Sequence, residues 1–367
     1  MLSRLAIFIP SLAGGGAERA MLNLMHGFVK QGIDIDLVLV KAEGPYLSQV
    51  PPQVRIVNLA SQRLLLSIPG LVRYLRRERP SVLLSVMEDT NIVALWSRRL
   101  AGVTTRVVVN VQNTISQESQ NTTQLKRRLT PQLLRWFYPW AESIVPVSQG
   151  VAEDLARIGL SLERVQVIYN PVVTPELFKK AQEPVEHPWF LPGQPPVILG
   201  VGRLEQQKSF STLIRAFAQM HQQHSVRLII LGEGSERPYL ETLVQELGLT
   251  ENVALPGFVA NPYAYMARSA MFVLSSAWEG LPTVLIEAMA VETPVVSTDC
   301  ESGPAEILKN GKYGKLVGVG DIQGLAEAMI STLREPPDIR ALQQRSDDFS
   351  LERVLVQYLQ VLQGKSI

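Results

Sequence analysis

The apolar positions of the chain fall into short runs, and most runs are followed by a segment with helical spacing. Residues 5–10 form the first run, and a glycine-rich loop leads from it into a helical pattern over residues 17–31. A second apolar run covers residues 35–40. This order predicts a strand, a helix and a second strand, which together make one βαβ unit.

The second half of the chain opens in the same way. Residues 197–201 form a short apolar strand, Phe210, Leu213 and Phe217 mark one face of a helix, and residues 226–231 form the next strand. In both halves the second strand starts about 30 residues after the first, which is the usual length of a βαβ unit.

Further apolar runs alternate with helical segments. They are "SVLLSVM", "TRVVVNV", "SIVPVS", "VQVIYN", "NVALPGF", "AMFVLS" and "TPVVST". The alternation predicts an α/β fold with parallel sheets covered on both faces. We expect two doubly wound, Rossmann-like domains at residues 1–175 and 197–349, joined by a proline-rich linker at residues 176–196. A closing helix at about residues 350–367 can cap either domain, including the first.

Composition narrows the class of protein. The 367 residues are 46% hydrophobic and carry a net charge of +1, which suits two globular domains and gives no reason to expect nucleic acid as a partner. The single cysteine, Cys300, excludes an intrachain disulfide and favours a cytoplasmic protein. Pro10 and Ser11 interrupt the N-terminal apolar run, which argues against a signal peptide. No stretch offers the roughly 18 apolar residues of a transmembrane helix.

Doubly wound sheets bind ligands at the carboxyl ends of their strands, and two such domains place the ligand in the cleft between them. In the first domain the loop "AGGGAER" leads into a helix. Gly14, Gly15 and Gly16 allow close backbone approach, so the helix N-terminus can bind a phosphate or a sugar hydroxyl. A tight strand-to-helix turn would use the same glycines. Arg19 replaces the third glycine of the dinucleotide-binding pattern.

The matching loop of the second domain, "GVGRLEQQK", carries two cations. Arg203 follows the strand and Lys208 precedes the helix. Together they can neutralise a diphosphate, although cations are also common on solvated surfaces.

The stretch "SSAWEGLPTVLIE" places one carboxylate before a predicted helix and another inside it. Pro282 suits the first helical turn, so nearby N–H groups can form a second anion site. Glu287 lies roughly 7.5 Å along the helix from Pro282, so Glu279 and Glu287 are not expected to act as a paired dyad. A sugar nucleotide would use one carboxylate for sugar hydroxyls and the other for ribose. Glu279 alone could simply complement the helix dipole.

Six motifs occur in a characteristic order: "GGGAER", "VIYNP", "GRLEQQK", "LGEGSER", "LPGF" and the E-x7-E motif "EGLPTVLIE". In this order they resemble the family 4 glycosyltransferases of the GT-B fold over nearly the whole chain. The resemblance implies a retaining hexosyl- or N-acetylhexosaminyltransferase that needs no metal or other cofactor. It also implies a nucleotide-sugar donor, UDP-linked, and a lipid-linked or polysaccharide acceptor in cell-envelope or exopolysaccharide synthesis.

The same resemblance assigns roles to individual residues of the second domain. Arg203 and Lys208 bind the diphosphate, Glu287 binds ribose, and Glu279 contacts the transferred sugar, so that Glu279, Arg203 and Lys208 form the catalytic set. Phe258 and Val259 sit against the base. The implied donor-binding set is Gly15, Gly16, Arg203, Lys208, Gly232, Phe258, Val259, Gly280, Leu281, Pro282, Thr283 and Glu287.

The first domain departs from the family pattern in one loop. Many relatives carry a histidine after the strand "RVVVNV", where this chain has Gln112 and Asn113. Gln112 can hydrogen-bond a sugar but cannot titrate as an imidazole does. We expect Gln112 and Asn113 to contact the sugar or the acceptor. In "MEDTN", Glu88 and Asn91 either bind the acceptor or cap the loop.

Two further stretches have a functional and a structural interpretation. The "DID" at residues 34–36 imitates a metal-binding spacing but precedes a strand, so we expect a solvated strand entrance. Residues 126–140 join basic residues to aromatic ones. They predict peripheral contact with an anionic membrane on its cytoplasmic side, or else a buried aromatic helix with a solvated basic face.

Two other functions fit the same residues. A nucleotide-sugar epimerase on the same fold would turn over the donor without an acceptor. A non-catalytic partner protein could have kept the fold; the retained Arg203, Lys208, Glu279 and Glu287 argue against this, whereas Gln112 argues weakly for it.

Overall fold

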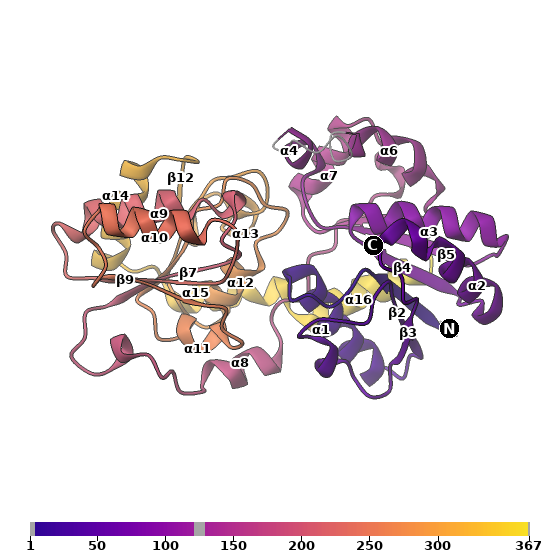
Figure 1. Ribbon diagram of the computed structural model, residues 1–367, viewed down its shortest axis with the longest axis horizontal. Helices are drawn as coiled ribbons and strands as arrows, with labels where there is room; N and C mark the ends of the chain where they lie inside the picture. The colour runs from indigo at the N-terminus through magenta and orange to yellow at the C-terminus, as the bar shows by residue number, and fades with distance from the viewer. Residues whose placement is uncertain (1–3, 121–128, 366–367) are drawn as a thin grey trace. The chain divides into compact units, whose positions relative to one another are not determined.

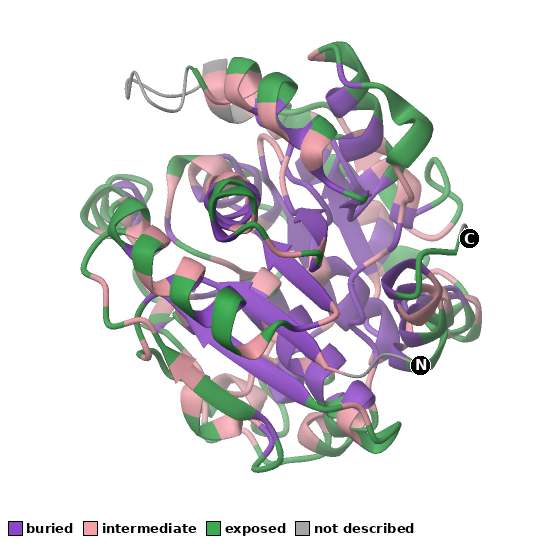
Figure 2. Cartoon of the chain, turned by 90° about the vertical axis from the view of Figure 1, so that its right-hand side faces the viewer, coloured by how far each residue is buried: buried purple, intermediate pink, exposed green. Residues whose placement is uncertain are grey.

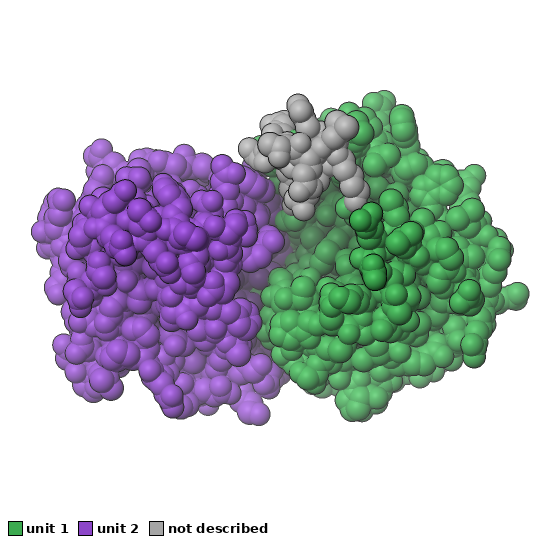
Figure 3. All heavy atoms as spheres, viewed as in Figure 1, with its two compact units in different colours: residues 1–172, 351–367 green, residues 173–350 purple. Residues whose placement is uncertain are grey.

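The computed structural model describes residues 4–120 and 129–365. The chain divides into two compact units, one of residues 1–172 with 351–367 and one of residues 173–350 (Figures 1 and 3). The C-terminal helix therefore belongs to the first unit. The stretch at residues 176–196 belongs to the second.

The first unit is built on a six-stranded parallel sheet in the order β3-β2-β1-β4-β5-β6. Its strands are β1 (Leu5–Ile9), β2 (Ile35–Leu39), β3 (Arg55–Asn58), β4 (Val82–Val86), β5 (Arg106–Val111) and β6 (Ser143–Pro146). Its helices are α1 (Gly16–Lys30), α2 (Ile68–Glu78), α3 (Glu88–Ala101), α4 (Ile115–Gln120), α6 (Thr130–Phe137), α7 (Gln149–Arg157) and α16 (Leu351–Leu362).

The second unit repeats this plan with a sheet in the order β12-β11-β10-β7-β8-β9. Its strands are β7 (Val197–Val201), β8 (Arg227–Leu231), β9 (Val253–Gly257), β10 (Met271–Leu274), β11 (Val295–Thr298) and β12 (Lys315–Val317). Its helices are α8 (Pro175–Ala181), α9 (Phe210–His221), α10 (Arg237–Glu246), α11 (Pro262–Met266), α12 (Thr283–Ala290), α13 (Pro304–Ile307), α14 (Ile322–Arg334) and α15 (Ile339–Ser346).

The central strands are buried on both faces because helices cover both sides of each sheet. Every residue of β1 and β4 is buried, and Figure 2 shows buried strands beneath helices whose outer faces are exposed. In the first unit α16 packs against α1, and Leu355 and Tyr358 join the core (Figure 1). Such continuous apolar strands are what parallel sheets require. None of the described helices has the length and apolar character needed to cross a bilayer.

Three features of the strand pattern differ from expectation. The run "VQVIYN" is not a strand; it makes an isolated bridge between Ile144 and Val165 and donates two backbone hydrogen bonds to β6, from Gln166 and Ile168. Two edge strands, β3 and β12, were not predicted, because neither forms a long apolar run. All but one of the β3 residues are exposed, since an edge strand with one covered face does not need continuous apolar sequence.

Asp36 does not lie at a solvated strand entrance as predicted. Its side chain is buried, and it accepts hydrogen bonds from Arg55 Nε at 2.8 Å and from the Tyr74 hydroxyl at 2.7 Å. Burial alone would raise the pKa of Asp36, but the hydrogen bonds from Arg55 and Tyr74 outweigh it and hold that pKa below its ordinary value. Asp36 thus links Arg55 on the edge strand β3 to Tyr74 on α2, so its role is structural.

We expect Asp36→Asn to lower the free energy of unfolding at neutral pH by about 2 kcal/mol, because charge-assisted hydrogen bonds are lost. The lowered pKa means that this stabilisation is present above the unfolded-state value near 3.8 and is lost as pH falls through the folded-state value. In urea titrations the two proteins should therefore converge in acid, and the exposed Asp34→Asn should match wild type throughout. A stability gap that widens on acidification would contradict this assignment.

Candidate functional site

Two loops at the carboxyl ends of β7 and β10 are hydrogen-bonded to each other. The Ser275 hydroxyl donates to the carbonyl of Lys208 at 2.8 Å, and the N–H of Ala277 donates to the carbonyl of Gln207 at 2.8 Å. The Gln207 amide in turn donates to the carbonyl of Trp278 at 2.9 Å. The two segments that the sequence singled out in the second domain therefore form one surface.

Lys208 and Glu279 form an ion pair on this surface. Lys208 Nζ lies 2.6 Å from Glu279 Oε1, and the Ser276 hydroxyl donates to the same oxygen at 2.6 Å. The two side chains are only 14% and 7% exposed, so each charge needs the other. Burial and the Glu279 carboxylate also raise the pKa of the adjacent Cys300, which keeps that thiol protonated. An anionic ligand that engages Lys208 must compete with Glu279.

Glycines bring a third loop against the first. A Cβ placed on Gly232 would lie 1.9 Å from the carbonyl oxygen of Gly202, and one on Gly234 would lie 2.3 Å from that of Leu204. Gly232 also has a φ of +142°, which L side chains rarely adopt. Both glycines are therefore needed for the β8 loop to pack on the β7 loop.

The loop before α12 is also hydrogen-bonded to residues 301 and 302. The N–H of Glu279 donates to the carbonyl of Glu301 at 2.9 Å, and the Ser302 hydroxyl donates to the carbonyl of Gly280 at 2.9 Å. Pro282 is the N-cap and supplies no side-chain cap, so the first N–H groups of the helix, at Thr283 and beyond, are suited to an anion. Gly280, Leu281 and Pro282 all lie in this fixed loop.

Four other predicted residues lie around these loops. Arg203 is exposed, and its Nη2 is 3.5 Å from Gln207 Oε1, too long for a strong hydrogen bond. Phe258 directly follows β9 and is 60% exposed, with Val259 half-buried beside it. Glu287 lies one turn into α12 and is 7% exposed. A planar apolar ligand could stack on Phe258, because an exposed aromatic ring offers an open face.

The glycine-rich loop of the first unit leads directly into α1. Gly15 is the N-cap and Gly16 the first helical residue. A Cβ on Gly15 would lie 2.5 Å from Glu18 Oε2, so a carboxylate from the first turn already lies over this helix start. The position therefore suits a hydroxyl group better than a second anion.

Gln112 is held in place by buried amides. Its Oε1 accepts from Asn170 Nδ2 at 2.9 Å, its Nε2 donates to Asn110 Oδ1, and its backbone N–H donates to Glu88 Oε1 at 3.2 Å. Nε2 also donates to Asn170 Oδ1 at 3.4 Å, so both of its N–H groups are used and only Oε1 retains one further accepting valence. Glu88 itself follows Met87, whose φ of +75° is a strained conformation typical of functional turns. Asn113 is half-buried next to Gln112.

The expected acceptor contact does not suit Asn91. The side chain is fully buried, and its amide donates to the carbonyl of Asn110 at 2.8 Å and to the Tyr138 hydroxyl at 2.9 Å. Asn91 fixes α3 against β5, which places the neighbouring Gln112 loop. The hydrogen bonds of Asn91 to Asn110 and Tyr138 therefore support the fold and leave its amide nitrogen unable to bind an acceptor.

Sequence reasoning missed several residues that hold the site together: Ser276, Gln207, Ser302 and Asn170. Ser276, Gln207 and Asn170 lie inside recognised motifs, and Ser302 follows the apolar run "TPVVST" by four residues, so proximity to a predicted strand end was the available signal. The sequence does not show which residues are hydrogen-bonded to each other, because partners such as Gln112 and Asn170 lie 58 positions apart. Within the described residues no three His, Cys, Asp or Glu side chains gather as metal ligands would.

The basic and aromatic stretch at residues 126–140 is described only in part, because Lys126, Arg127 and Arg128 lie outside the described residues. Trp136 is 65% exposed, whereas Tyr138 is fully buried. The rings of Phe137 and Trp140 pack edge to face with Trp96 of α3, at centroid distances of 5.4 and 5.2 Å. The stretch thus has both a buried aromatic part and an exposed tryptophan.

Sequence profiles of two known families match successive parts of the chain. "Glycosyltransferase Family 4" matches residues 14–175, and "Glycosyl transferases group 1" matches residues 182–348. Each match covers one of the two repeated βαβ series.

Individual relatives match nearly the whole chain. The N-acetylgalactosamine-N,N'-diacetylbacillosaminyl-diphospho-undecaprenol 4-alpha-N-acetylgalactosaminyltransferase of Campylobacter jejuni is 31% identical over 350 residues, 91% of each chain. The lipopolysaccharide core biosynthesis glycosyltransferase LpsE of Rhizobium meliloti is 28% identical over 364 residues, 96% of each chain.

Solved structures show the same fold. Anabaena HepE in complex with UDP and glucose has a TM-score of 0.81 at 19% identity, covering 98% of this chain and 99% of that one. Sucrose-phosphate synthase from Thermosynechococcus elongatus has a TM-score of 0.83 at 20% identity, covering 98% of each chain.

Proposed function

Because the chain belongs to the family 4 glycosyltransferases of the GT-B fold, we propose that it moves a sugar from a nucleoside-diphosphate donor to a lipid-linked or saccharide acceptor. The product would be a cell-envelope or exopolysaccharide glycan. Both sequence relatives described above are glycosyltransferases; the name of one specifies a diphospho-undecaprenol substrate, and the other acts in lipopolysaccharide core synthesis. The single observation that carries the proposal is that hydrogen bonds and the ion pair between Lys208 and Glu279 join the β7 loop to the loop that leads into the uncapped start of α12.

In this proposal the donor lies on the joined loops of the second unit. Lys208 and Arg203 donate hydrogen bonds to the diphosphate, and the first N–H groups of α12 are further donors. Phe258 faces the base, and Glu287 accepts from the ribose hydroxyls. UDP is our preferred nucleotide, since HepE, which shares the fold, was solved with UDP bound.

Charge development explains how such a site accelerates transfer. As the bond between sugar and phosphate breaks, negative charge grows on the leaving diphosphate and positive charge on the sugar ring. Lys208, Arg203 and the helix start stabilise the leaving group without any metal. Glu279, released from Lys208 when the diphosphate binds, stabilises the oxocarbenium-like ring. We propose retention of anomeric configuration, which NMR of the product tests directly.

We place the acceptor on the first unit. Gln112, Asn113 and Glu88 would contact the sugar or the acceptor, because the remaining valence of Gln112 Oε1 can accept a hydrogen bond from a hydroxyl group. A lipid-linked acceptor requires contact with the membrane, and the exposed Trp136 beside basic sequence supports peripheral attachment through residues 126–140 on the cytoplasmic face.

A donor screen tests the proposal. Nucleotide sugars are ranked by thermal shift, and the best binder is then incubated with and without lipid-linked acceptor while UDP release and sugar products are measured. We expect acceptor-dependent UDP release and a glycosylated lipid. A changed sugar isomer without acceptor would identify an epimerase. Donor binding without turnover on any acceptor tested would favour the non-catalytic partner.

A further inference from the structure

The exposed apolar side chains of the first unit are concentrated on one helical layer. Among the described residues of this unit, nine large apolar side chains are exposed, and six of them lie on or next to α2, α3 and α6: Leu65, Leu66, Trp96, Leu100, Leu129 and Trp136. The helices pack side by side, with α3 between the other two. Only part of this layer belongs to residues 126–140.

The largest exposed pair lies outside that stretch. Leu65 and Leu66, 63% and 64% exposed, lie in the short 3-10 helix η2 (Leu64–Ser67), which leads into α2 and contacts α3. Two adjacent leucines held in water by an ordered turn lose the benefit of burial. Their exposure points to a partner that covers them.

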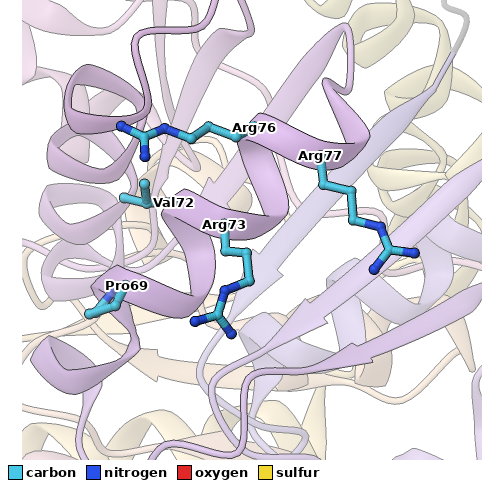
Figure 4. Close-up of a pocket in the computed structure, with 5 residues that line it drawn as sticks. All are labelled: Pro69, Val72, Arg73, Arg76 and Arg77. Atoms are coloured by element: carbon cyan, nitrogen blue, oxygen red, sulfur yellow. The ribbon is translucent and has the colours of Figure 1, made fainter.

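The outer face of α2 supplies positive charge next to these leucines. Pro69, Val72, Arg73, Arg76 and Arg77 recur at helical spacing and line a hollow of about 520 Å³ (Figure 4). The opposite face, with Leu71 and Leu75, is buried in the unit. The helix is therefore amphipathic, and its outward side is basic.

The arginines of this face differ in how far they are engaged. Arg76 donates to the carbonyl of Leu100 at 2.9 Å and so caps the end of α3. Arg73 is exposed and makes no hydrogen bond or ion pair with any described residue; Arg77 reaches only Glu78, at 3.5 Å. Arg73 and Arg77 are thus open to an external anion.

The charge of the segment is one-sided. Residues 63–79 contain five arginines and one acidic residue, Glu78. A hydrogen bond from Arg55 lowers the pKa of Glu78, and the carboxylate is shared between Arg55 and Arg4 at 3.0 Å each. Arg77 is farther from this carboxylate, at 3.5 Å, than Arg55 and Arg4 are, so one shared acid leaves the segment with an excess of positive charge.

We propose that η2 and α2 form a membrane-docking element for an anionic phospholipid bilayer. Leu65 and Leu66 enter the boundary between headgroups and acyl chains, while Arg73 and Arg77 bind headgroup phosphates. An apolar turn beside an arginine face matches both layers of such a surface. The inference uses the proposed function only to explain why the protein would visit a membrane, and it involves none of the donor-binding residues.

Vesicle sedimentation with the full chain tests this element. The variants are Leu65→Ser with Leu66→Ser, and Arg73→Gln with Arg77→Gln. Their matched controls are Leu162→Ser, which is 48% exposed elsewhere on the first unit, and Arg215→Gln with Arg334→Gln on the second. Vesicles contain phosphatidylcholine alone or mixed with phosphatidylglycerol.

We expect the arginine pair to lower partition onto phosphatidylglycerol vesicles on the order of tenfold at low salt, and the difference to shrink at high salt. The leucine pair should lower it by a similar factor at both salt concentrations, and the controls should match wild type. UDP binding and thermal melting of all variants should stay unchanged, which separates this test from that of the proposed function. Partition equal to wild type, or a change in oligomeric mass without a change in partition, would overturn the proposal.

Discussion

Lys208→Ala should weaken UDP binding by about 10- to 100-fold, which is the effect of losing charge-assisted hydrogen bonds to a diphosphate. Uridine, which lacks the diphosphate, should bind with nearly unchanged affinity. Titration calorimetry with UDP, UMP and uridine measures both effects on the same protein. The exposed Lys179→Ala is the matched control for loss of a positive charge.

The structure adds a complication that must be separated from binding. Lys208→Ala leaves the buried Glu279 carboxylate without its ion-pair partner, so the variant should also be less stable. Adding Glu279→Gln removes that unpaired charge and should recover much of the stability without restoring UDP affinity. If both variants lose UDP and uridine equally, Lys208 does not bind the diphosphate.

Glu279→Gln should reduce the rate of sugar transfer by about 100- to 1,000-fold while keeping or raising UDP affinity, because the carboxylate that competes with the diphosphate for Lys208 is removed. Glutamine keeps the oxygen that accepts from Lys208 and Ser276, so the loops stay in place. What it loses is the negative charge that opposes the developing positive charge on the sugar ring. The comparison needs kcat and KM separately, because a transition-state role lowers kcat.

The control for this second variant is Glu246→Gln, an exposed glutamate at the end of α10. It should transfer sugar at the wild-type rate. A Glu279→Gln protein with unchanged kcat would remove Glu279 from the catalytic set, and one with a raised KM alone would make it a donor-binding residue.

The fold was predictable because parallel sheets impose a strong pattern. Central strands such as β1 and β7 are short and fully apolar, and the following helices show their buried faces at regular spacing. The edge strand β3 was not predictable, since its exposed residues carry no such pattern. The stretch "VQVIYN" has a strand-like composition but lies outside both sheets, which only tertiary context decides.

The candidate site was predictable by position but not by contact. Strand-end loops indicated Lys208 and Glu279 separately, and a role was assigned to each. Their ion pair joins residues 71 positions apart, and no local sequence pattern predicts it. For the same reason the sequence left Asn91 as either an acceptor contact or a loop cap, whereas the structure buries this α3 side chain against β5.

The basic face of α2 shows a similar limit. Residues 63–79, "RLLLSIPGLVRYLRRER", contain five leucines, and the sequence alone does not decide which of them are buried. The structure buries Leu71 and Leu75 but leaves Leu65 and Leu66 exposed, because η2 turns them away from the core that α2 enters. Exposure of apolar side chains is decided by packing partners and not by composition.

Binding of a nucleoside diphosphate by the joined loops of the second unit can be observed in a crystal structure of the protein with UDP. We expect diphosphate oxygens within about 3 Å of Lys208 Nζ and of the first N–H groups of α12, with Phe258 against the uracil ring. UDP bound away from these loops, with the ion pair between Lys208 and Glu279 undisturbed, would contradict it.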